Sequence, residues 1–252
     1  MRAGGPGTLP RLSAVDFDPF AGPALLAAVP STESQREIWT AAQLGRDASL
    51  AFNESNSLLL RGPLDLAALR RSLADLLARH ESLRSTFSSD GLTLCVGEPS
   101  PADLPLSDLS GLPPEEREAT LGRLLVEEVE TPFDLERGPL FRARVARLGP
   151  EEHRLVFTGH HIVLDGWSTG VLVCDWARLY SARRDGREPA LPPAEPFTAY
   201  ALDLARDQAG REAHEAYWLK QFEGPVPVLA LPTDRPRPAF KTFAARRLDG
   251  LL

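Results

Sequence analysis

Two adjacent histidines, followed by an aspartate and a glycine, carry the clearest chemical signal in this 252-residue sequence. His160 and His161 end an apolar stretch, and Asp165-Gly166 suits a tight turn. Neighbouring strand side chains point to opposite faces, so at most one histidine can face a given cleft. A histidine side chain can accept a proton at neutral pH. The pattern therefore predicts a general base at a strand end, with a purely structural histidine pair as the alternative.

Other kinds of site find less support. His160, His161 and Asp165 could supply three metal ligands, but adjacent strand residues diverge and no nearby cysteine or glutamate completes the set. His80-Glu81 is not followed by a third ligand at helical spacing. The sequence also has no glycine-rich phosphate loop and no G-x-S-x-G turn. We therefore expect no metal and no bound cofactor, and a serine hydrolase or nucleotide enzyme lacks support.

Composition excludes several classes of protein. The net charge is −7, from 28 basic and 35 acidic residues, whereas nucleic-acid-binding proteins normally carry a basic patch. No apolar run reaches the roughly 18–20 residues of a membrane helix, and the N-terminus lacks the apolar segment of a secretory signal. Cys95 and Cys174 each lie in an apolar run and are expected to be buried, reduced thiols. We expect a cytoplasmic protein that binds neither nucleic acid nor membrane.

Hydrophobic periodicity predicts helices and strands in mixed order, which indicates an α/β fold with a mixed sheet flanked by helices. Residues 1–29 show no sustained period and are expected to be a linker or leader. The predicted helices begin after Pro30 and after Asp65 and cover about 114–130, 168–184 and 197–222, and the predicted strands cover 53–62, 140–148 and 154–163.

Three local patterns give more specific expectations. Thr32 and Gln35 have the spacing of a capping box, and Ser168 can cap the helix after the histidines. Asp90-Gly91 indicates a hairpin turn. The buried side of the 114–130 helix is expected to be lined by apolar residues at helical spacing: Leu121, Leu124, Leu125 and Val129.

Six short motifs occur in order between about residues 30 and 240. They are SQREIW (34–39), RHESLRSTF (79–87), PFDL with GPL (132–140), HHIVLDG (160–166), YALD (200–203), and YW (217–218) with LPTDRPRP (231–238). This series resembles the condensation domains of nonribosomal peptide synthetases, relatives of chloramphenicol acetyltransferase. Residues 160–166 match the family's HHxxxDG core, and 79–87 is close to RHExLRTxF. The resemblance implies a chloramphenicol acetyltransferase-like lobe.

The resemblance also implies an activity in secondary-metabolite biosynthesis. Family members join two thioesters, each tethered by phosphopantetheine to a peptidyl or acyl carrier protein, through an amide bond. By the same resemblance, His161 faces the reacting groups and His160 packs structurally. Asp165 is expected to be a buried structural residue paired with Arg84, and Gly166 to permit a backbone conformation that a side chain would oppose. Trp167 extends the motif.

The sequence departs from the family pattern in two ways. Gly159 stands where the family often has methionine. Only the N-terminal lobe and the start of the crossover are recognised, in residues 30–252, and the motifs of the second lobe are absent. We therefore expect a fragment that is inactive when isolated from its C-terminal lobe.

The resemblance leaves other functions open. The chain could be a non-catalytic lobe that only binds carrier proteins, or part of a free-standing acyltransferase of the same superfamily. Epimerisation is also compatible with the histidine motif. Heterocyclisation fits less well, because His-His replaces the first part of its DxxxxD pattern.

Overall fold

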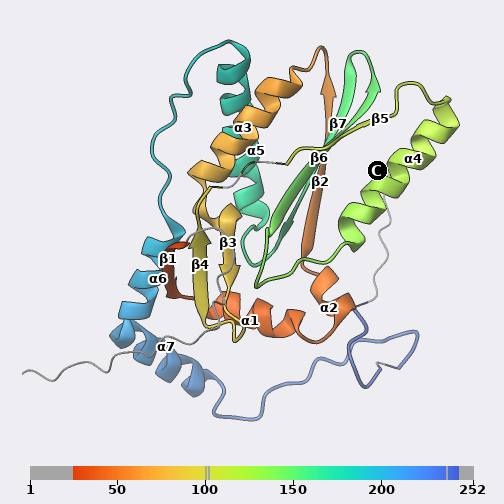
Figure 1. Cartoon of the computed structure of the whole chain (residues 1–252). Coiled ribbons are helices and arrows are strands. Elements are labelled where there is room, and N and C mark those ends of the chain that lie inside the picture. Colours follow the sequence, from red (N-terminus) through yellow and green to blue (C-terminus); the bar gives the residue numbers. More distant parts are fainter. Residues whose placement is uncertain (1–24, 100, 102, 237, 244–252) are drawn as a thin grey trace, which may run out of the picture.

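The structure is a computed structural model that describes residues 25–99, 101, 103–236 and 238–243. Its strands and helices follow one another in mixed order along the chain (Figure 1). In order they are β1 (Leu25–Pro30), α1 (Glu33–Ala42), α2 (Arg46–Leu50), β2 (Asn53–Arg61), α3 (Leu66–Arg79), a 3₁₀ helix (Glu81–Arg84), β3 (Ser85–Phe87), β4 (Thr93–Gly97), β5 (Leu106–Asp108), α4 (Pro114–Glu130), β6 (Phe141–Gly149), β7 (Glu152–His160), α5 (Gly166–Arg184), α6 (Phe197–Arg206) and α7 (Gln208–Gln221).

The strands form two sheets. The larger has the order β2-β7-β6-β5, in which β7 pairs antiparallel with β2 and β6, while the short β5 pairs parallel with β6. The smaller is antiparallel, with the order β1-β4-β3. The prediction of a mixed sheet flanked by helices is confirmed, although a second small sheet accompanies it.

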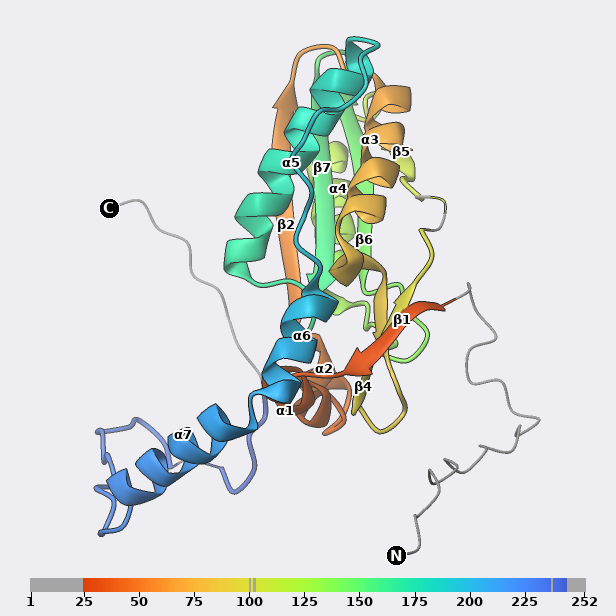
Figure 2. The ribbon, with the colours of Figure 1, turned by 90° about the vertical axis from the view of Figure 1, so that its left-hand side faces the viewer.

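Helices cover both faces of the larger sheet. Helices α3 and α5 pack side by side on one face, and α4 lies on the other (Figures 1 and 2). The leucines at helical spacing in α3 explain its orientation, because Leu69, Leu73 and Leu76 are buried beneath it. Trp176 of α5 donates to the hydroxyl of Ser72 across the α3–α5 contact, at 3.0 Å. Strand β7 lies at the centre of this sandwich.

The predicted hairpin turn at Asp90-Gly91 joins β3 to β4 in the small sheet. Gly91 has φ +71°, and a Cβ placed on it would lie 2.5 Å from Cδ2 of Trp39 in α1. Only glycine fits both the left-handed backbone and this close approach. The hydroxyl of Ser31 donates to the Gly91 carbonyl at 2.6 Å, which ties the turn to the start of α1.

Three expectations about the fold are wrong in part. Residues 25–29, expected in the linker or leader, belong to β1, which pairs with β4, while residues 1–24 lie outside the described residues. The helix expected over 197–222 is two helices, because the chain turns at Asp207, whose carboxylate caps Gly210 N at 2.9 Å. Cys95 is buried as expected, but Cys174 is exposed.

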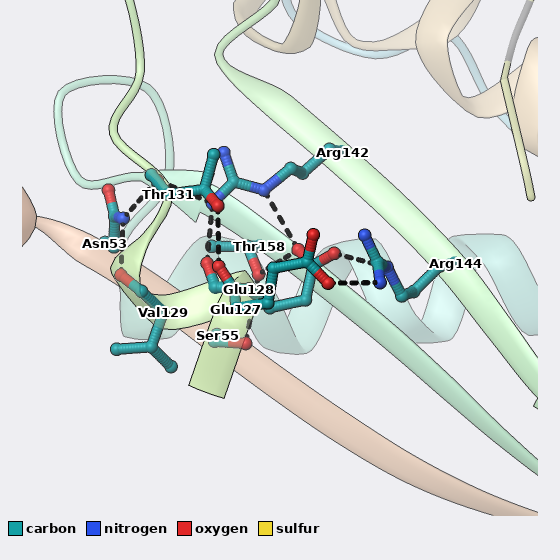
Figure 3. A network of polar contacts seen from close by, with 9 residues as sticks. All are labelled: Asn53, Ser55, Glu127, Glu128, Val129, Thr131, Arg142, Arg144 and Thr158. Carbon is teal, nitrogen blue, oxygen red and sulfur yellow. Dashed lines mark hydrogen bonds and ion pairs between the residues drawn. The ribbon is translucent and has the colours of Figure 1, made fainter. Parts of the chain in front are cut away.

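At the C-terminal end of α4 a glutamate, and not the predicted valine, is buried against the sheet. Val129 is 44% exposed, and Glu128 is 2% exposed. The Glu128 carboxylate lies 2.9 Å from Nε of Arg142 and 2.6 Å from Nε of Arg144, and Thr158 donates to it at 3.1 Å (Figure 3). The arginines that alternate with apolar residues along β6 therefore bind α4 to the sheet instead of facing only solvent.

No helix within the described residues is long and apolar enough to cross a bilayer.

Candidate functional site

The histidine pair lies where β7 ends. His160 is the last residue of β7, and residues 161–165 form the connection to α5. His160 is fully buried, whereas the His161 side chain is 39% exposed and lines a large cleft. Only one of the two histidines faces the cleft, as expected, but His161 lies in the turn after β7 and not on the strand.

The cleft has a volume of about 1140 Å³ and is walled by segments far apart in the sequence. The N-terminal half of α1 and the 161–165 connection form one side, and α6 with α7 forms another. Side chains of several chemical types line it, among them Gln35, His161, Ser168, Tyr200, His214 and Trp218. Arg211 of α7 lies 3.5 Å from Glu33 of α1 and links two of the walls.

The ring of His161 is held at Nδ1. This nitrogen forms a hydrogen bond with the Leu164 carbonyl at 3.1 Å and lies 2.6 Å from Oε1 of Glu54. Among the described residues, none forms a hydrogen bond with Nε2. A carbonyl oxygen only accepts, so in the neutral form of His161 the proton lies on Nδ1 and the lone pair on Nε2.

Glu54 is a site residue that the sequence motifs do not reveal. It lies at the start of β2, opposite Gly159 in the antiparallel register, and Asn53 is opposite His160. The predicted strand over 53–62 is confirmed, but sequence alone does not show which strand pairs with the histidine strand. The sequence signal for Glu54 is a charged residue near the start of the predicted 53–62 strand.

His160 is a neutral, packed residue. Its ring lies between Phe52 and Phe133, with ring centroids 5.8 and 6.1 Å away, and its Nδ1 accepts from Ile162 N at 3.2 Å. Burial, aided by the nearby His161, lowers the pKa of His160 to about 4. The buried ring thus supports the 161–165 connection from beneath and remains uncharged at neutral pH.

The lowered pKa of His160 predicts acid sensitivity. As the pH falls from 6.5 to about 4, the unfolded chain takes up a proton that the folded protein excludes. The free energy of unfolding is expected to decrease over this interval by roughly 3 kcal/mol more than in His160→Asn. Denaturant unfolding of both proteins at several pH values measures this difference. Parallel pH profiles for the two proteins would contradict the prediction.

Asp165 does not have the role expected from the sequence. It is exposed, and it caps α5 by accepting from the backbone N and the hydroxyl of Ser168, at 2.7 and 2.5 Å. These hydrogen bonds, that of the hydroxyl first, lower the pKa of Asp165. Ser168 therefore donates to the cap instead of being the cap.

The expected partner of Asp165 lies elsewhere. Arg84 donates to the Gly97 carbonyl, between the 3₁₀ helix and the end of β4, and forms no ion pair with Asp165. Gly166 is the first residue of α5, has no left-handed φ, and a Cβ there would meet nothing within 4 Å. Trp167 is 85% exposed. The predictions of an Asp165–Arg84 ion pair and of a special backbone conformation at Gly166 are both wrong.

The helix-capping role of Asp165 predicts how its substitution changes stability. Asp165→Ala is expected to lower the free energy of unfolding by about 1 kcal/mol, because two donors at the start of α5 lose their acceptor. Asp165→Ser retains a capping oxygen and is expected to remain close to the parent. Thermal or urea unfolding measures both variants. A loss of several kcal/mol in Asp165→Ala would indicate the buried ion pair that the structure does not contain.

The RHE segment at the end of α3 is structural. Arg79 Nε and His80 Nε2 lie 2.8 and 3.1 Å from the same carboxylate oxygen of Asp175 in α5. Burial acts to raise the pKa of Asp175, but Arg79 and His80 outweigh it and hold the pKa below its ordinary value. Glu81 accepts from Thr198 N at the start of α6. The segment thus joins α3, α5 and α6.

Gln35 connects α1 to the histidine loop. The predicted capping box is confirmed, since the Gln35 side chain accepts from Thr32 N at 3.1 Å and Thr32 caps Gln35 N. The amide of the same side chain donates to the Ile162 carbonyl at 3.3 Å, and Gln35 is only 6% exposed. One buried side chain therefore caps the helix and holds the loop that carries His161.

The described residues contain no cluster of potential metal ligands. No group of three or more histidine, cysteine, aspartate or glutamate side chains there is placed to hold an ion. What the described cleft offers is a positioned imidazole with a free nitrogen, in a hollow with room for extended substrates.

Comparison with protein families finds a match over most of the chain. The family model described as "Condensation domain" matches residues 27–251. Chondramide synthase cmdD of Chondromyces crocatus is 41% identical over 223 residues, covering 85% of this chain and 6% of that protein. Malpibaldin synthetase of Mortierella alpina is 41% identical over 222 residues, covering 83% of this chain and 4% of that protein.

Solved structures match in the same way. The starter condensation domain of rhizomide synthetase RzmA has a TM-score of 0.70 and 27% identity, covering 77% of this chain and 48% of that one. The X-domain in its complex with OxyB from teicoplanin biosynthesis has a TM-score of 0.71 and 33% identity, covering 84% and 47%. The chain thus spans about half of these structures and a few per cent of the two synthetases.

Proposed function

The chain belongs to the condensation-domain family, and we propose that it forms one lobe of a domain that makes amide bonds in nonribosomal peptide synthesis. The two substrates are acyl or aminoacyl thioesters, each tethered by phosphopantetheine to a carrier protein. The lobe comprises residues 30–252 together with strand β1, and a second, C-terminal lobe completes the domain. The match to only about half of the solved condensation-domain chain supports this division.

The observation that carries the proposal is Nε2 of His161, with which no described residue forms a hydrogen bond. The ring reaches into the cleft, and its other nitrogen is held by Leu164 and Glu54. A side chain fixed in this way can accept a proton from an amine at neutral pH. His161 is therefore assigned the catalytic role, and His160, Asp165 and Gln35 support the loop on which it lies.

The reaction needs little chemistry from the protein. The acceptor amine attacks the donor thioester carbonyl, a C–N bond forms, and the C–S bond breaks. His161 takes the proton that the amine loses, and this proton returns to the departing thiolate, so the imidazole ends neutral. Holding two tethered reactants together supplies several kcal/mol of the barrier reduction. The activation comes from the thioesters, so the domain uses no bound cofactor of its own.

The proposed partners follow from this reaction. They are a donor and an acceptor carrier protein and the C-terminal lobe, with no nucleic acid and no membrane surface. The net charge of −7 supports the exclusion of nucleic acid. The proposed location is the cytoplasm.

Amide formation between two loaded carrier proteins tests the proposal. The complete synthetase that contains this chain is mixed with a donor-loaded and an acceptor-loaded carrier, and the product is detected on the acceptor carrier by mass spectrometry. We expect product with the complete protein and none with the 252-residue chain alone. Absence of product from the complete protein with any loaded pair would overturn the proposal.

The X-domain match supports a second candidate, a lobe that binds a partner without catalysis. That structure is a complex with another protein, OxyB. Binding of a loaded carrier protein without product formation by the complete protein would favour this candidate. The cleft with its oriented His161 favours catalysis instead.

A further inference from the structure

A carboxylate lies against the nitrogen of His161 that faces away from the proposed reaction. Oε1 of Glu54 is 2.6 Å from Nδ1, and the two side chains are 30% and 39% exposed. The residues are far apart in the sequence, on either side of α3 and α4. The contact is short and partly shielded from water, so a positive charge on the ring would be stabilised there more than in a fully exposed ion pair.

The surrounding strands hold this contact in place. Glu54 is opposite Gly159 in the β2–β7 ladder, so the carboxylate comes from the strand next to the histidines. Its neighbour Asn53 donates to the carbonyls of Val129 and Thr131, at 2.8 and 2.9 Å, which fixes the start of β2. The backbone on both sides of the contact is therefore anchored.

The contact determines what His161 can do. With two acceptors near Nδ1, the proton stays there and the lone pair is on Nε2, the nitrogen available to a substrate. When Nε2 accepts a proton, the ring becomes a cation beside the Glu54 carboxylate. Histidine bases in other enzymes are oriented and stabilised by a third group in this way.

We propose that Glu54 is a positioning residue for His161, which keeps the proton on Nδ1 and stabilises the imidazolium that forms during amide bond formation. This inference rests on the proposed function in assigning the base role to His161. The Leu164 carbonyl shares the first task, but it carries no charge and cannot perform the second.

The first test reads the His161 ring directly in the 252-residue chain. Long-range proton–nitrogen NMR spectra of the histidine-labelled protein report which ring nitrogen carries the proton, and His161→Asn identifies the signal. We expect the Nδ1–H form to dominate in the parent and the Nε2–H form to increase several-fold in Glu54→Leu. Equal populations in parent and variant would overturn the inference while leaving the proposed function intact.

The second test measures how the charge of Glu54 affects the kinetics of the complete synthetase. Glu54→Gln retains the size of the side chain and is expected to lower kcat by roughly 10-fold to 100-fold with KM unchanged, less than loss of the base itself. Glu54→Asp is expected to recover part of the rate. The control is Glu152→Gln, which removes an exposed charge at the far end of the β2–β7 pair and is expected to retain the parent rate.

The outcomes separate the two proposals. A parent-like kcat in Glu54→Gln, together with a large loss in His161→Ala, would overturn the role of Glu54 alone. A parent-like rate in His161→Ala would overturn the catalytic assignment of His161. Melting temperatures of all variants are measured alongside, and a rate loss in a Glu54→Gln protein that melts like the parent supports the positioning role.

Discussion

Replacing His161 by alanine in the complete condensation domain is expected to slow amide formation by roughly 10²-fold or more. Among the described residues, this side chain supplies the free imidazole nitrogen at the 161–165 loop, because His160 is buried and its pKa is about 4. Orientation of the two tethered substrates remains, so a residual rate persists. Single-turnover kinetics with preloaded carriers measure the chemical step apart from loading.

His160 and His153 provide the controls for this experiment. His160→Ala removes a packed ring between Phe52 and Phe133 and is expected to reduce soluble yield and stability more than the rate of the folded fraction. His153→Gln changes a histidine at the other end of β7 and is the matched control for His161→Gln. Equal rate losses at positions 160 and 161 in well-folded variants would contradict the assignment of the base to His161.

Glu128→Ala is expected to lower the free energy of unfolding by about 3–5 kcal/mol, the largest stability effect of any single substitution considered for this chain. The substitution leaves Arg142 and Arg144 without the buried carboxylate that both contact, and it removes an acceptor of Thr158 (Figure 3). Arg142 also lies over the Phe133 ring, which packs against His160. Urea unfolding measures the loss.

The neighbouring glutamate is a matched control. Glu127 also contacts Arg144, at 3.1 Å, but its side chain is 58% exposed. Glu127→Ala is expected to cost less than about 1 kcal/mol, because exposed ion pairs contribute little. A similar loss in both variants would show that burial of Glu128 is not the source of the effect.

Local pattern was sufficient for most of the fold. The capping box at Thr32, the helix that begins after Asp65 and the Asp90-Gly91 turn were predicted and are present, because each depends on residues within a few positions of one another. The break at Asp207 was missed, since the apolar residues of 197–222 suggest one continuous helix. Strand β1 was missed because a short edge strand without alternation depends on its partner, β4.

Most elements, the family motifs and the different placement of His160 and His161 could be predicted without a structure. Which distant groups meet depends on the packed fold: Glu54 with His161, Asp175 with Arg79 and His80, and Glu128 with two arginines of β6. The fold also separates Arg84 from Asp165, which the motif had suggested as partners. The physical reason is that a charge finds its partner through strand register and helix packing, which bring together residues far apart in the chain. Capping and periodicity act within a few residues, and they can therefore be recognised in the sequence.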